Sequence, residues 1–116
     1  MVTASDVVPL RLVAAAGVPA EAHGSYRTRP GAGVAVLTTS QLPRAPEGQH
    51  YAAWVRQGGL WIAFGDVEPG ADGRSLSVAE DGALGAVPEE LRVTLERGAV
   101  AAPTGTEVLA WRPSVP

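Results

Sequence analysis

Short stretches in which apolar and polar residues alternate recur along this chain, and such alternation is the pattern of half-buried β-strands. The clearest stretch is 49–57, in which Tyr51, Ala53 and Val55 occupy one face of the expected strand. The opposite face also carries apolar groups, Trp54 among them. Because apolar residues stand on both faces, the pattern predicts a central, largely buried strand whose Trp54 side chain stabilises the domain.

Seven further stretches have a similar character, and clusters of turn-forming residues separate them. In one of them Leu76 and Val78 alternate with other residues, so we expect both side chains on the inner face. Gly58 and Gly59 fit a tight hairpin loop between two strands. The seven stretches are 6–14, 23–28, 33–39, 60–67, 74–79, 91–96 and 107–112. Eight strands of this length predict an all-β fold, a two-sheet antiparallel β-sandwich of the immunoglobulin-like kind.

Composition supports a single β-sandwich domain over residues 1–116, because a chain of 116 residues is long enough for one domain and too short for two. Hydrophobic residues make up 46% of the chain, which is enough for a core without metal or crosslinks. The 14 Gly and 10 Pro argue against a helical bundle and suit short strands joined by turns. With no Cys, the chain has neither a disulfide framework nor a thiolate site.

The charge of the chain argues against binding to nucleic acid or to an anionic membrane surface. The net charge is −3, whereas both partners call for a cationic surface. The apolar segment 13–18, followed by small residues at 20–22, imitates a signal peptide, but Asp6, Pro9 and Arg11 do not fit one. No stretch approaches the ~18 apolar residues of a membrane helix.

Candidate metal ligands do not form a recognisable pattern. His23 and His50 have no third ligand at a suitable spacing, so we expect no metal site. Asp66, Glu68 and Asp72 faintly resemble a calcium loop, but Gly70 interrupts the required run of oxygen ligands. We therefore interpret that segment as a turn between strands.

Candidate catalytic residues are also missing from the sequence. Ser25 lies near His23 without the motif of an activated nucleophile, so the sequence predicts no catalytic residue, no cofactor and no enzyme. Glu89 and Glu90 suggest a solvated turn. Glu96 falls on the polar face of an alternating strand, where we expect it to fasten the following loop through backbone amides.

Two further tryptophans admit two interpretations. Trp61 and Trp111 either pack against the core or the sheet, or form exposed binding platforms. Packing is favoured, since large aromatic side chains are usually well buried.

Four segments between residues 42 and 111 carry a resemblance to a known family. In this order and spacing they resemble the C-terminal extracytoplasmic domain of RskA-type anti-sigma factors, the anti-sigma-K factor family. The segments are 42–43 with 48–55, then 64–69 with 72–74, then 91–96, and finally 103–105 with 108–109. The positions that match the family's motifs, and for which the resemblance implies structural roles, are Tyr51, Trp54, Gly73, Thr94, Glu96, Pro103 and Gly105. After Glu96 the chain departs from the family pattern, with Arg97 and Gly98 where the family usually has Pro and a Gly-Gly pair.

The resemblance implies a longer, membrane-anchored bacterial parent protein from which this domain is excised. A cytoplasmic segment of the parent would bind an extracytoplasmic-function sigma factor, a single membrane helix would follow, and this domain would lie outside the membrane. Family members release the sigma factor through regulated proteolysis, so a protease or an extracellular ligand is an implied partner. The alternative is a ligand-binding or carbohydrate-binding accessory β-sandwich of a secreted or cell-surface protein, which a tryptophan cluster on an exposed sheet face would support.

Overall fold

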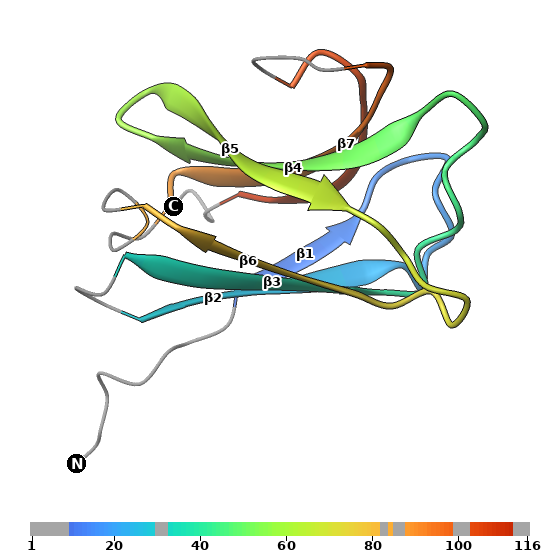
Figure 1. The fold of residues 1–116 in the computed structure, drawn as a ribbon, viewed down its shortest axis with the longest axis horizontal. Helices are drawn as coiled ribbons and strands as arrows, with labels where there is room; N and C mark the ends of the chain where they lie inside the picture. Colours follow the sequence, from blue (N-terminus) through green and yellow to red (C-terminus); the bar gives the residue numbers. More distant parts are fainter. Residues whose placement is uncertain (1–9, 30–32, 82–83, 85–87, 99–102, 113–116) are drawn as a thin grey trace.

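The computed structural model describes residues 10–29, 33–81, 84, 88–98 and 103–112, and these residues form eight β-strands. All neighbouring strands are antiparallel, in the order β5-β4-β7-β8-β1-β2-β3-β6 (Figure 1). The strands are β1 (Leu10–Ala14), β2 (His23–Arg29), β3 (Val34–Ser40), β4 (His50–Gln57), β5 (Leu60–Val67), β6 (Ser75–Glu80), β7 (Glu90–Glu96) and β8 (Thr106–Trp111). The prediction of eight antiparallel strands is confirmed.

The eight strands form one sheet that curls into a nearly closed barrel, so the prediction of two separate sheets is not confirmed. The two layers visible in Figure 1 are joined where β1 pairs with β8, through Val13 with Ala110 and Ala14 with Leu109. The edge strands β5 and β6 approach each other on the remaining side, where the Ser77 hydroxyl donates a hydrogen bond to the Asp66 carbonyl oxygen at 3.3 Å. Alternation along single strands does not reveal such a junction, because it reports burial and not pairing.

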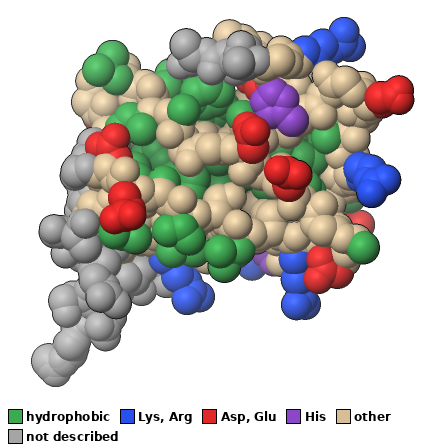
Figure 2. Space-filling view, in the orientation of Figure 1, with side chains coloured by type: hydrophobic (Ala, Val, Ile, Leu, Met, Phe, Trp, Pro, Cys, Tyr) green, Lys and Arg blue, Asp and Glu red, His purple; other side chains and the backbone are tan. Residues whose placement is uncertain are grey.

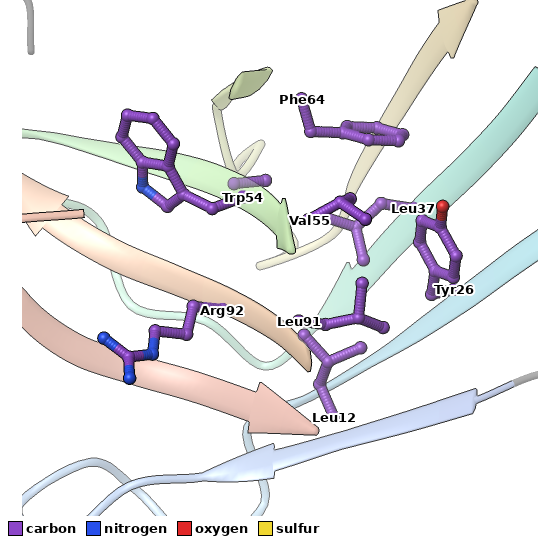
Figure 3. A pocket seen from close by; sticks show the side chains of 9 residues that line it. Leu12, Tyr26, Leu37, Trp54, Val55, Phe64, Leu91 and Arg92 are labelled. Atoms are coloured by element: carbon purple, nitrogen blue, oxygen red, sulfur yellow. The ribbon is translucent and has the colours of Figure 1, made fainter. Parts of the chain in front are cut away.

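The interior of the barrel is filled by apolar side chains from both layers. Leu12 and Tyr26 meet Val55, Phe64 and Leu91 there, and the rings of Tyr26 and Phe64 pack edge to face at 5.9 Å (Figure 3). A void of only about 10 Å³ remains between them. Burial of these side chains, at roughly 25 cal/mol per Å² of apolar surface, is the main force that holds the barrel together.

A β-bulge in β5 sets which side chains of that strand enter the core. Ala53 pairs with Gly65 and Trp54 pairs with Ala63, so Phe64 is the extra residue. Gly65 has a φ of 138°, a conformation that a residue with a Cβ rarely adopts. The bulge allows both Phe64 and Val67 to be buried.

The side chains of β6 point to the opposite faces from those predicted. Leu76 is 68% exposed and Val78 is 58% exposed, so the prediction that they lie on the inner face is wrong. The reason is the register with β3, which places Ser77 opposite the buried Leu37 and therefore turns Ser77 toward the interior. Alternation defines two faces of a strand but does not say which of them meets the core.

Candidate functional site

The residues predicted to match the family's motifs form two groups, and the larger group lies on the outer face of β4 and β7. Trp54 is only 2% exposed, as the sequence predicts. Its neighbours Ala53 and Val55 belong to the barrel core, so the indole projects to the opposite face. Figure 3 shows the Trp54 and Arg92 side chains pointing away from those that fill the interior. Trp54 is thus buried outside the barrel.

A chain of hydrogen bonds connects the indole of Trp54 to a buried carboxylate. The indole Nε1 donates to the Thr94 hydroxyl at 2.9 Å, and that hydroxyl donates to Oε2 of Glu96 at 2.7 Å. A hydroxyl can accept one hydrogen bond and donate another, so Thr94 satisfies both neighbours. All three side chains are buried, which makes the pairing of every polar atom energetically important.

Glu96 fastens the segment that leads from the loop after β7 into β8. Its Oε2 accepts hydrogen bonds from the backbone amides of Thr104 at 3.1 Å and Gly105 at 2.9 Å. Its Oε1 accepts a third from the Thr104 hydroxyl at 3.0 Å. This is the contact with backbone amides predicted from the sequence. Pro103, half-buried, directly precedes the fastened residues.

Gly105 is required by the closeness of this contact. A Cβ atom at this position would collide with the carbonyl oxygen of Leu95 and would lie 2.9 Å from Oε1 of Glu96. Any larger residue would therefore push the 103–105 segment away from the carboxylate.

The surroundings keep Glu96 ionised. Burial by itself would raise the pKa of Glu96, but hydrogen bonds from Thr94, Gly105 and Thr104 favour the charged form, and the net effect lowers the pKa. A carboxylate held by four donors is a structural anion. Its role here is to hold the backbone of Thr104 and Gly105 in place.

The second group of motif residues fastens the segment between β3 and β4. The Tyr51 hydroxyl donates to the carbonyl oxygen of Pro43 at 2.7 Å, and the amide of Leu42 donates to the carbonyl oxygen of Gly73 at 3.2 Å. Gly73 has a φ of 78°, which favours glycine. Tyr51 and Gly73 therefore hold two neighbouring residues of the same segment, Pro43 and Leu42.

Comparison with known proteins identifies a family that the chain matches over most of its length. The family model described as "Anti-sigma-K factor rskA, C-terminal" matches residues 3–109. The chain belongs to this family. The match includes the first forty residues, which carry little of the resemblance visible in the motifs. Neither a curated protein nor a solved structure matches the chain.

A cluster of charged residues on the same outer face is the feature that sequence reasoning missed. Glu90 is 6% exposed and belongs to β7, so its assignment to a solvated turn is wrong. Its carboxylate lies near three arginines, at 2.8 Å from Nε of Arg92, 3.0 Å from Nη2 of Arg112 and 3.4 Å from Nη1 of Arg56. The only sign of it in the sequence was the spacing from Glu96. Glu90 and Glu96 are an even number of residues apart, so a strand places both on the same face.

The tryptophans of the chain do not form an exposed cluster. Trp111 packs against the barrel core, and Trp61 is half-buried with the Arg92 guanidinium 4.9 Å from the centre of its ring. Packing, the favoured interpretation, thus holds for Trp111, while Trp61 forms a cation–π contact on the outer face.

The remaining candidates have simple surroundings. His23 Nδ1 lies 2.9 Å from the carbonyl oxygen of Glu21, and His50 Nε2 lies 3.7 Å from Oδ1 of Asp66. Asp72 accepts a hydrogen bond from the backbone amide two residues later, as expected for a turn. Within the described residues, no three His, Cys, Asp or Glu side chains are grouped so that they could hold a metal ion. The same residues include no helix with the length and apolar character needed to cross a membrane.

Proposed function

We propose that this chain is the extracytoplasmic regulatory domain of a membrane-anchored anti-sigma factor, and that it controls release of an extracytoplasmic-function sigma factor by limiting proteolysis of its parent. The observation that carries the proposal is the family match over residues 3–109. Fold alone would not carry it, since small β-barrels serve many unrelated functions.

The position of β1 suggests how the domain limits proteolysis. In the proposed parent, the membrane helix precedes this domain, so the connecting chain leads into β1 at Leu10. β1 pairs with β8 on one side and with β2 on the other. A protease needs an extended, accessible segment, so cleavage next to β1 depends on how often β1 leaves the sheet. A signal that shifts this equilibrium shifts cleavage.

The domain acts in this proposal without chemistry of its own. Glu96, the buried carboxylate of the motif group, accepts hydrogen bonds from two backbone amides and from the hydroxyls of Thr94 and Thr104. The carbohydrate-binding alternative is not favoured, because the tryptophan cluster that would support it is absent: Trp54 is buried and the other two tryptophans are at least half-buried.

The test uses the complete parent protein in its host, with a reporter of sigma-dependent transcription. Gly105→Ala should destabilise the domain by about 1–3 kcal/mol through overpacking against Leu95 and Glu96. We expect a several-fold rise in basal reporter output and in the cleaved parent, since a loss of this size raises the unfolded population. Deletion of the domain should make release constitutive.

Gly70→Ala is the matched control. A Cβ there would meet its nearest atom at 3.4 Å, an ordinary contact, and Gly70 has no positive φ. Unchanged reporter output after deletion of the domain, under every stress condition, would show that the domain does not control release.

A further inference from the structure

The outer face of β6 is apolar and exposed. Leu76 and Val78 project outward, and the outward-facing Val36 of β3 lies opposite Val78. Figure 2 shows hydrophobic side chains reaching the surface on the side of the molecule where β5 and β6 lie. Single exposed apolar residues are common, but here the apolar face of a strand points outward while Ser75 and Ser77 point inward. This inversion indicates that another surface covers the strand.

The sequence of β6 and the residue before it is self-complementary. If two copies of 74–80 run antiparallel about a centre at Ser77, Leu76 of one copy faces Val78 of the other. The same alignment places Arg74 opposite Glu80 at both ends. An apolar centre with an ion pair at each end is the pattern of an isologous interface, in which one patch meets its own copy across a twofold axis.

The charged ends of this segment are available for such pairing. Arg74 and Glu80 are both exposed, and neither has an ion pair within the described part of the chain. A shallow hollow of about 450 Å³ lies beside Arg74, between Leu76 of β6 and Thr38 of β3. This hollow gives the carboxylate of an opposing Glu80 a place next to the guanidinium. Asp72 also lines the hollow, but its Oδ1 already accepts a hydrogen bond from the Arg74 amide.

We propose that the outer face of β6 is a dimerisation surface and that its occupant is a second copy of this chain, with the two β6 strands antiparallel. The faces pack and not the edges, because the free edge of β6 is turned toward β5, as the bond from Ser77 to Asp66 shows. The apolar patch is small, so the dimer is weak and depends on concentration. Each chain carries a net charge of −3, and the two Arg74–Glu80 pairs locally offset the repulsion between copies.

The first test is sedimentation velocity of the chain over a concentration series. We expect the mass to rise from monomer toward dimer with concentration. The double variant Leu76→Thr/Val78→Thr should raise the dimer dissociation constant by about tenfold or more, because it removes the apolar centre of the interface. Threonine keeps the preference for a strand, so the barrel should stay folded, which circular dichroism verifies.

The matched control is Leu60→Thr/Val13→Thr. Leu60 is 72% exposed and Val13 is 58% exposed, and neither lies on β6. Dimerisation should be unchanged in this variant. A chain that stays monomeric at all concentrations would overturn the proposal, and the partner that covers β6 would then be a different protein. A dimer whose dissociation constant is unaffected by the changes at Leu76 and Val78 would also overturn it.

A charge swap tests the alignment itself and does not depend on the apolar variants. Arg74→Glu places two glutamates opposite each other at each end, so the dissociation constant should rise about tenfold. Glu80→Arg should have a similar effect. The double variant Arg74→Glu/Glu80→Arg restores both pairs with reversed sign and should dimerise nearly as well as the wild type. A double variant as weak as either single one would exclude the proposed twofold arrangement.

Discussion

Two buried glutamates on β7 have different kinds of partner. Glu90 is surrounded by three arginine side chains, whereas Glu96 is held by backbone amides and hydroxyls. The guanidinium groups of the arginines supply compensating charge from the ends of long side chains. Backbone amides are fixed in position, so Glu96 fixes the loop whose amides it binds.

Sequence could reveal one of these residues and not the other. Glu96 ends an alternating strand directly before a long loop, and an acceptor in that position has a local use. The partners of Glu90 lie on β4, on β7 and directly after β8, and only the three-dimensional pairing of those strands brings Arg56 and Arg112 to it. The sequence near Glu90 places it on the same strand face as Glu96 but does not identify its distant partners.

Glu96→Gln should destabilise the chain by about 1–3 kcal/mol at neutral pH, because the hydrogen bonds to an ionised acceptor are replaced by weaker ones. Urea denaturation followed by circular dichroism measures the change. Glu68→Gln is the control, since Glu68 is exposed on the loop after β5 and should alter the free energy of unfolding by less than about 0.5 kcal/mol. Equal stability of the two variants would contradict the role assigned to Glu96.

The contribution of Glu96 should depend on pH in a defined direction. The folded state lowers the pKa of Glu96 below its ordinary value of 4.5. The stabilisation is therefore complete above the pKa in the unfolded chain and is lost as the pH falls through the lower pKa of the folded chain. The stability difference between wild type and Glu96→Gln should shrink over this acidic range. A difference that stays constant down to low pH would contradict the ionised state.

At the scale of the strands, alternation predicts where strands lie better than how they face. The expected stretches 49–57 and 91–96 coincide closely with β4 and β7, where both flanking strands impose the same facing. β6 pairs within the sheet only with β3, and its inward residues are Ser75, Ser77 and Ala79. An edge strand is less constrained by its neighbours, so its apolar face can turn outward when that face contacts another surface.

Glu89, which directly precedes β7, fastens the β4–β5 hairpin. Glu89 accepts hydrogen bonds from the amides of Gly58 at 3.1 Å and Gly59 at 3.0 Å, and the bond from Gly59 is the main cause of its lowered pKa. Glu89→Ala should therefore speed amide hydrogen exchange at Gly58 and Gly59 several-fold while the core amides stay protected. Glu68→Ala should leave both rates unchanged. Unaltered exchange in the Glu89 variant would show that the carboxylate does not hold the turn.

At the scale of the whole molecule, the short strand β1 turns two layers into one sheet. It pairs with β8 at only two positions, yet this junction connects the first and the last strand of the described residues. Sequence reasoning could not find it, because a pairing between distant ends depends on how the intervening strands are arranged. The proposed function depends on this junction. Through it, β1, the strand into which the connecting chain leads, is coupled to the stability of the entire barrel.

Leu12 is the residue through which this dependence can be measured. It is 1% exposed and is the most deeply buried side chain of β1. Leu12→Ala should cost about 2–5 kcal/mol by leaving a cavity between the layers. Because the sheet is continuous, tryptophan fluorescence, to which Trp54 of the other layer contributes, and far-ultraviolet circular dichroism should report the same urea midpoint in the variant. Val13→Ala, at an exposed position of the same strand, should change stability by less than about 0.5 kcal/mol. If fluorescence kept the wild-type midpoint while circular dichroism shifted, the layer that contains β4 and Trp54 would be folding independently of β1. Release of β1 could then not act on the whole domain.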